Sequence, residues 1–267
     1  MKRLILITGL MLSVIFPCAT WAIHPITQML CGDPRFNCIH VHGGDTWDSL
    51  FPDPDEQNLV MRANRINAPL WRGMLLAVPN DPGSMRVDDL NPMDNQIPPA
   101  GHKVIIVDPK VDAWGAYDAD GQLVKWGPAS TGADWCSDLQ STCHTPTGDF
   151  MIYAKNGVDC ESSKFPLGEG HAPMPFCMFF HEGFALHGSP EVPGFNASHG
   201  CVRIFFNDAE WLNEEFIDVP TRENHYKGTE VVIKPYANEG DKNGTVSSGS
   251  DSNTTPVKVN STNNSSG

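Results

Sequence analysis

HGSPEVPGFNASHGCVRI, the stretch from His187 to Ile204, combines two histidines and one cysteine with glycines, prolines and short polar residues. Three interpretations fit these residues: a metal site, one half of a disulfide, and the nucleophile and base of an enzyme. Each of them requires a different state of the Cys201 sulfur. The cysteines of the whole chain therefore decide how this stretch is interpreted.

The first 22 residues have the pattern of a secretory signal peptide. Lys2 and Arg3 form a basic start, an apolar run follows from Leu4 to Phe16, and Thr20-Trp21-Ala22 is a small-x-small cleavage site. The apolar run is shorter than the roughly 20 residues that span a bilayer. We therefore predict cleavage after Ala22 and export of the mature protein into an oxidising compartment.

Cleavage at this position would remove Cys18 and leave an odd number of cysteines. The remaining cysteines are Cys31, Cys38, Cys136, Cys143, Cys160, Cys177 and Cys201. Proximity in the sequence favours three pairs, 31–38, 136–143 and 160–177, among the roughly 15 pairings that six cysteines allow. Cys201 is then left over. A thiol that stays reduced among oxidised neighbours is more often chemical than structural, so Cys201 is the candidate reactive group.

Length and composition limit the class of protein. The chain has 267 residues, enough for one large domain or two ordinary ones. Its hydrophobic fraction of 40% and charged fraction of 19% fit a globular protein, and 22 Pro and 24 Gly predict many turns. The formal net charge of −14 argues against nucleic acid or an anionic membrane surface as a partner.

Changes in composition divide the chain into segments. The segments that we predict are a signal peptide (1–22), a short leader (23–37), a compact N-terminal module (38–79), a linker rich in Pro, Asp and Asn (80–100), a main domain (101–236) and a disordered tail (237–267). The tail has almost no large apolar residues, which is the composition of chains that do not fold.

Short runs separated by turns predict a mainly β main domain, sandwich-like with mixed sheets and one or two short helices. The expected strands are 103–107, 114–117, 122–126, 150–154, 178–180, 184–187 and 229–234. The expected helix runs from Asp208 to Phe216 and is capped by Asn207. The N-terminal module reads as a small α+β domain with strands near 38–41 and 74–78 and helices near 46–51 and 55–65.

A nucleophilic cysteine needs a nearby base, because a thiol with a pKa near 8.5 is mostly protonated at neutral pH. His187 precedes Cys201 by a loop rich in glycine and proline, which could return the cysteine to the imidazole. His187 would then take the thiol proton, and the sulfur would attack a carbonyl to form an acyl-enzyme. The backbone N–H groups of Cys201 and Gly200 could stabilise the oxyanion.

Two other interpretations of the stretch stay open on these residues alone. Cys201 could be a buried hydrophobic residue or half of a disulfide. His187, His199 and Cys201 could bind zinc, although they lack the tight Cys-x-x-Cys or His-x-x-x-His spacing of structural sites.

Four motifs in order resemble the L,D-transpeptidases of bacterial cell walls. The signature is Ser198-His199-Gly200-Cys201-Val202-Arg203 preceded by His187-Gly188. The other motifs are STG at 130–132, TPTGDF at 145–150, and MPFCMFF at 174–180 followed by ALHG at 185–188. The resemblance covers roughly residues 103–234, and the motifs together are far more specific than any one of them.

This resemblance implies a role for each matched residue. Cys201 would be the nucleophile and His187 the general base; Ser198, His199 and Gly200 would frame the site; Arg203 and Gly188 would bind substrate. The reaction would attack the stem tetrapeptide of peptidoglycan, release D-Ala and transfer the acyl group to an amine of another stem or of a wall-linked protein. The resemblance implies no cofactor and no metal. It places the protein in the periplasm or cell wall, without a stable membrane anchor after cleavage.

The N-terminal module resembles a lysin motif. The matching residues are Val41 to Trp47, Leu59, Asn64, Leu70, Gly73, Leu75 and Val78-Pro79. Such modules bind glycans that contain N-acetylglucosamine, so this one would hold the enzyme on peptidoglycan and raise the local substrate concentration.

Two alternatives to a transpeptidase remain at this stage. The same thiol with water as the acceptor would make an L,D-carboxypeptidase. A domain that has lost its activity would be a non-catalytic peptidoglycan-binding protein. The sequence does not separate these possibilities, and it leaves the acyl acceptor, the cross-link type and the oligomeric state open.

Overall fold

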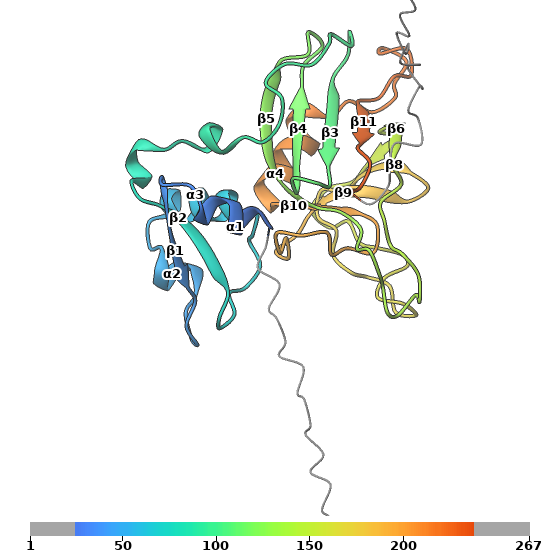
Figure 1. The fold of residues 1–267 in the computed structure, drawn as a ribbon. Coiled ribbons are helices and arrows are strands. Elements are labelled where there is room, and N and C mark those ends of the chain that lie inside the picture. The colour runs from blue at the N-terminus through green and yellow to red at the C-terminus, as the bar shows by residue number, and fades with distance from the viewer. Residues whose placement is uncertain (1–24, 238–267) are drawn as a thin grey trace, which may run out of the picture.

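The computed structural model describes residues 25–237 (Figure 1). The predicted signal peptide and all but the first residue of the predicted tail lie outside the described residues. Within the described part of the chain, no helix has the length and hydropathy needed to cross a membrane.

The N-terminal unit is a two-stranded antiparallel sheet with helices packed on it. Its elements are α1 (Pro25–Cys31), β1 (Phe36–His40), α2 (Trp47–Leu50), α3 (Pro54–Asn64) and β2 (Leu75–Pro79). The central α3 begins at Asp53, whose carboxylate accepts hydrogen bonds from the Asp55 and Glu56 amides, and it ends at Arg65 in the left-handed conformation. Val60, Ile66 and Leu76 are fully buried between these elements. The helices and strands that the sequence predicts here are confirmed to within one or two residues.

The stretch that the sequence analysis treats as a leader contains α1, which packs against α3 and β2. The Cys31–Cys38 disulfide fixes the end of α1 to β1. The hydroxyl of Thr27, which is fully buried, donates to the Asn64 side chain at 3.1 Å. These contacts make α1 a structural part of the N-terminal unit.

The predicted linker follows the main domain closely. It contains two short 3₁₀ turns, η1 (Pro82–Ser84) and η2 (Val87–Leu90), and Met93 packs among Ala113 and Trp126. Backbone hydrogen bonds join Ile97 to Gly121 and Leu123 to Asn95. The segment therefore lies fixed along the main domain.

The main domain is built on one mixed sheet in the order β6-β11-β3-β4-β5-β10-β9-β8-β7. The strands are β3 (Val104–Asp108), β4 (Ala113–Tyr117), β5 (Leu123–Ser130), β6 (Gly148–Met151), β7 (Ala154–Lys155), β8 (Met178–His181), β9 (Phe184–Gly188), β10 (Val202–Ile204) and β11 (Glu230–Ile233). The pairs β3–β11 and β9–β10 are parallel, and the other pairs are antiparallel. The sheet curls so that β6 contacts β8, and Phe150 meets Phe180 with ring centroids 5.5 Å apart. The predicted mainly β fold with mixed strands is confirmed.

The predicted helix starts two residues earlier than expected. It comprises α4 (Phe206–Trp211) and a π-helical turn, η3 (Leu212–Phe216), and its N-cap is Phe205. Asn207 lies inside the helix, so the prediction that it caps the helix is wrong. The buried Asp208 and Ala209 face inward, and α4 packs against β9.

Candidate active site

The candidate nucleophile and base come from neighbouring parallel strands. His187 on β9 lies opposite Arg203 on β10, and Leu186 lies opposite Val202. Cys201 directly precedes Val202. Because side chains alternate across a strand, Cys201 and Arg203 project to the same face of the sheet, and His187 shares that face with its partner Arg203. Cys201 and His187 are therefore diagonal neighbours on one face.

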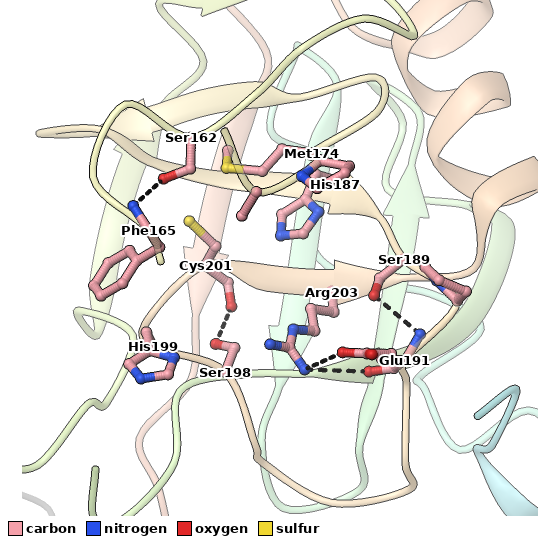
Figure 2. A pocket seen from close by; sticks show the side chains of 13 residues that line it. Ser162, Phe165, Met174, His187, Ser189, Glu191, Ser198, His199, Cys201 and Arg203 are labelled. Carbon is pink, nitrogen blue, oxygen red and sulfur yellow. Dashed lines mark hydrogen bonds and ion pairs between the residues drawn. The ribbon is translucent and has the colours of Figure 1, made fainter. Parts of the chain in front are cut away.

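That face opens into a cavity of about 360 Å³ (Figure 2). The residues that line it are Ser162, Phe165, Ala172, Pro173, Met174, His187, Ser189, Pro190, Glu191, Ser198, His199, Cys201 and Arg203. Figure 2 shows the Cys201 side chain and the His187 ring entering the same space. Two segments form the walls, one at 162–174 and the other at 187–203.

Cys201 is the free cysteine among residues 25–237. The other six pair as Cys31–Cys38, Cys136–Cys143 and Cys160–Cys177, which confirms the predicted disulfides. Burial raises the pKa of the Cys201 thiol, and a hydrogen bond with the Ala185 backbone and the positive charge of Arg203 partly oppose this rise. The resting side chain is therefore a neutral thiol at pH 7.

His187 is only 6% exposed, and its Nδ1 lies 2.9 Å from the Gly188 carbonyl oxygen. A carbonyl only accepts, so Nδ1 carries the proton and donates it to this oxygen, which leaves the Nε2 lone pair free. Burial lowers the pKa of His187 to about 4, with a further contribution from the Arg203 charge and opposition from the Gly188 carbonyl. At pH 7 the ring is a neutral imidazole that can accept a proton at Nε2.

Ser198 holds the turn that carries Cys201. Its hydroxyl accepts a hydrogen bond from the Gly200 N–H at 3.0 Å and donates to the Cys201 carbonyl. Its backbone is bonded to Thr131 and Ala133, which fixes the turn to the segment after β5. The Gly200 N–H is thus already bonded to Ser198. Of the two backbone N–H groups that the sequence suggests for the oxyanion, the Cys201 N–H is the remaining candidate.

Gly200 is required by conformation and by packing. Its φ is +119°, and a Cβ there would lie 2.4 Å from the Phe184 ring. The space beside Gly200 is filled by Phe184, so substrate cannot approach the backbone from that side. Its role is to let the turn before Cys201 close onto β9.

His199 is tied to the loop closed by the Cys136–Cys143 disulfide. Its Nε2 lies 2.9 Å from an Asp138 carboxylate oxygen, and its ring packs against Phe165 with centroids 4.8 Å apart. Asp138 was not predicted from the sequence, because it lies 61 residues from His199. In the described part of the chain, the ligand atoms of Cys136, Asp138 and His199 lie close enough together to share a metal ion. The Cys136 sulfur, however, is bonded to Cys143 in a disulfide.

The two predicted substrate-binding residues lie in different places. Arg203 lines the cavity, with Nη1 at 3.8 Å from the Glu191 carboxylate and 3.4 Å from its carbonyl oxygen. Gly188 is buried behind the cavity, where its N–H donates to the Pro175 carbonyl and its Cα packs near Ala209. Gly188 therefore holds the His187 ring and does not itself line the cavity.

Several lining residues were missed by the sequence analysis. Ser162, Phe165 and Met174 belong to the segment bounded by the Cys160–Cys177 disulfide, whose 17-residue spacing is a weak signal for a loop over the site. Glu191 follows Pro190 in the loop after β9. It carries no motif of its own, and its place is fixed only by the fold.

Comparison with known proteins supports the resemblance of the main domain. Residues 102–233 match the YkuD family, described as the L,D-transpeptidase catalytic domain. No curated protein matches the chain. The match starts at residue 102, so the likeness of residues 38–79 to a lysin motif stays a prediction.

Similar solved structures include three L,D-transpeptidases. That of Xylanimonas cellulosilytica is 25% identical with a TM-score of 0.47, covering 67% of this chain and 79% of that one. That of Stackebrandtia nassauensis is 20% identical with a TM-score of 0.41, covering 58% of this chain and 62% of that chain. That of Mycobacterium smegmatis is 20% identical with a TM-score of 0.38, covering 50% of this chain and 59% of that chain. From the family match, the chain carries at residues 102–233 a catalytic domain of the L,D-transpeptidase family.

Proposed function

We propose that the protein is an exported L,D-transpeptidase in which Cys201 is the nucleophile and His187 the general base. The observation that carries this proposal is that an unpaired thiol and a neutral imidazole with a free Nε2 enter one cavity. The other six cysteines among residues 25–237 are bonded in pairs, which is the state expected in an oxidising compartment such as the periplasm or the outer side of a cell wall.

The proposed first half-reaction forms a thioester. His187 Nε2 takes the proton of the Cys201 thiol while the sulfur attacks the carbonyl that precedes the terminal D-Ala of a stem tetrapeptide. The Cys201 backbone N–H stabilises the resulting oxyanion. The intermediate collapses with cleavage of the amide bond, and the protonated His187 gives its proton to the departing amine of D-Ala.

The second half-reaction returns the enzyme to its starting state. An amine of another stem, or of a wall-linked protein, attacks the thioester carbonyl and loses a proton to His187. The Cys201 sulfur leaves as a thiolate and receives that proton. Water in place of the amine would give the carboxypeptidase reaction by the same steps.

Arg203 is the proposed contact for a substrate carboxylate. It is the positive charge of the cavity, and its contacts with Glu191 are long for an ion pair of full strength. A carboxylate of the stem can therefore replace Glu191 at the guanidinium. His199 frames the site together with the disulfide loop that carries Asp138.

The N-terminal unit is proposed to bind glycan, as its likeness to a lysin motif implies. A groove of about 460 Å³ lies between the turn before α2 and the segment after α3, lined by Thr46, Trp47, Gln57 and Leu70 among others. Hydroxyl and amide groups are suited to a sugar. The protein should then co-sediment with peptide-free glycan strands, and an absence of co-sedimentation would remove this part of the proposal alone.

The deciding experiment compares wild-type protein with Cys201→Ala. Wild-type protein should exchange the terminal D-Ala of a stem tetrapeptide for a labelled D-amino acid and form a thioester visible by mass spectrometry, and the variant should do neither while keeping its melting temperature. Product analysis without an amine acceptor separates transfer from hydrolysis. A wild-type protein that forms no adduct with the tetrapeptide or with a carbapenem would indicate a non-catalytic wall-binding protein.

His187 is tested beside a matched histidine. His187→Gln should abolish thioester formation, because it removes the imidazole Nε2 that is proposed to accept the thiol proton. His171→Gln is the control, since His171 is an exposed histidine paired with Glu161 on the segment over the cavity. Equal losses in both variants would contradict the assignment of the base.

A further inference from the structure

The N-terminal unit contacts the back of the loop that forms one wall of the cavity. The Asn67 side chain donates from Nδ2 to the Ser189 carbonyl at 2.8 Å and accepts at Oδ1 from the Val192 N–H, also at 2.8 Å. The backbone adds a hydrogen bond from the Asn67 N–H to the Val192 carbonyl at 2.9 Å. One amide thus joins both ends of the segment 189–192.

The front of this same segment faces the substrate cavity. Ser189, Pro190 and Glu191 all line it, and Glu191 meets Arg203 (Figure 2). Inside the segment, the Ser189 hydroxyl accepts from the Glu191 N–H at 3.0 Å, and the Ser189 N–H donates to the Ile204 carbonyl at 2.9 Å. The position of Glu191, and with it that of the Arg203 guanidinium, therefore depends on how this loop is held.

An asparagine side chain suits this task because its amide offers a donor and an acceptor together. Pro190 and Pro193 have no N–H, so the loop can make few backbone hydrogen bonds of its own. Asn67 supplies two polar partners that the loop lacks internally. An aliphatic residue at this position would leave the Ser189 carbonyl and the Val192 N–H without them.

Asn67 is itself placed by a firm contact between the two units, which lie side by side in Figure 1. Arg62, near the end of α3, reaches the Asp208 carboxylate on α4 at 2.8 Å, and both side chains are almost completely buried. Arg65 lies over the Trp126 ring, 4.6 Å from its centroid. Asn67 follows α3 by three residues, so these contacts fix the point from which its side chain reaches the loop.

We propose that Asn67 is a positioning residue for substrate binding: from the N-terminal unit, it holds the loop 189–192 so that Glu191 and Arg203 are placed for the stem peptide. This inference rests on the proposed function, since it concerns the same cavity. It assigns the N-terminal unit a part in the active site in addition to the proposed contact with glycan, whose groove Asn67 also lines.

The competing explanation is that Asn67 only helps to join the two units. Loss of such a contact would lower the melting temperature and leave the KM for a peptide unchanged. Loss of a positioning contact would raise KM and leave the chemistry of the thiol unaffected, because Cys201 and His187 are held by β9 and the turn at Ser198. A stem tetrapeptide without sugar is the appropriate substrate, since its binding cannot reflect glycan contacts.

The test compares Asn67→Ala with Asn80→Ala in the full mature chain. Asn80 is an exposed asparagine of the same unit whose amide donates to the Pro34 carbonyl at 2.8 Å, away from the cavity. For Asn67→Ala we expect KM to rise roughly tenfold, as loss of two ordinary hydrogen bonds predicts. The kcat and the rate of Cys201 alkylation by iodoacetamide should stay within about twofold of wild type, the scatter of such comparisons. Asn80→Ala should match wild type in all three quantities.

An unchanged KM in Asn67→Ala would overturn the inference, and so would a fall in kcat matched by an equal fall in alkylation rate. If that variant does not fold, Asn67→Asp replaces it, because it keeps the shape and loses the donor to Ser189; it should raise KM as well. Hydrogen exchange of the Val192 amide gives a readout independent of activity. Faster exchange in Asn67→Ala than in Asn80→Ala is expected even if the wild-type protein forms no thioester, a result that would refute only the proposed function.

Discussion

His187 on β9 lies opposite Arg203 on β10, so a permanent positive charge faces the strand position that carries the proposed base. This charge helps to keep the His187 pKa low, and it also opposes the rise that burial causes in the pKa of the Cys201 thiol. One guanidinium thus favours the neutral form of the His187 imidazole and eases ionisation of the Cys201 thiol.

The first prediction concerns this charge. In Arg203→Gln the pKa of His187 and the pKa of the Cys201 thiol should both rise, so the pH profile of Cys201 alkylation should shift to higher pH. The kcat/KM for a tetrapeptide should fall about 10- to 100-fold, which corresponds to loss of a charge-assisted hydrogen bond to a carboxylate. Arg72→Gln, at an exposed arginine of the N-terminal unit, is the control. An unshifted alkylation profile would show that Arg203 does not act on the thiol.

The second prediction follows from the burial of His187. The folded ring has a pKa of about 4, well below the 6.5 of an exposed imidazole. Between these values the unfolded chain binds a proton that the folded protein does not, so the free energy of unfolding should fall as pH decreases from about 6.5 to about 4. The contribution of His187 is about 3 kcal/mol over that window. Urea unfolding of wild type and His187→Gln at pH 7 and pH 4.5 measures it, and equal pH dependence in the two proteins would contradict the burial argument.

The third prediction separates two effects at glycines with positive φ. Gly200→Ala places a Cβ against Phe184 as well as straining the backbone, and Gly44→Ala strains the backbone at φ +95° with nothing within 4 Å of the new Cβ. We expect Gly44→Ala to cost about 1 kcal/mol of stability and Gly200→Ala about 3 kcal/mol or more. Only Gly200→Ala should abolish thioester formation, because the turn before Cys201 must move. Thermal unfolding and mass spectrometry check both, and full activity in Gly200→Ala would refute the close packing of this turn.

The disulfides and α3 were predictable from the sequence because they depend on local information. The cysteine pairs are 7, 7 and 17 residues apart, and removing them from the count leaves Cys201. The Asp53-Pro54 pair marks the start of α3 by the ordinary preferences of helix termini. The candidate nucleophile and base also came from the sequence, since they lie in one short motif.

Other features depend on partners that are distant in the chain. β10 is three residues long, and its strand conformation comes from pairing with β5 and β9. The contact of Asn67 with Val192 joins residues 125 positions apart, and no pattern around either residue indicates it. The start of α4 at Phe206 is likewise set by packing, because Phe205 provides no capping side chain.

The buried pair between Arg62 and Asp208 limits how this protein can be divided. Cutting the chain near residue 100 would strip Asp208 of its arginine and leave Lys125, at 3.3 Å, as its remaining cationic neighbour. In a fragment that begins there, the Asp208 carboxylate on α4, the helix that packs against β9, would have lost its arginine partner. Domain exchange with a relative would succeed only if the donor brought its own match for that carboxylate, so the two halves are expected to be inherited and engineered together.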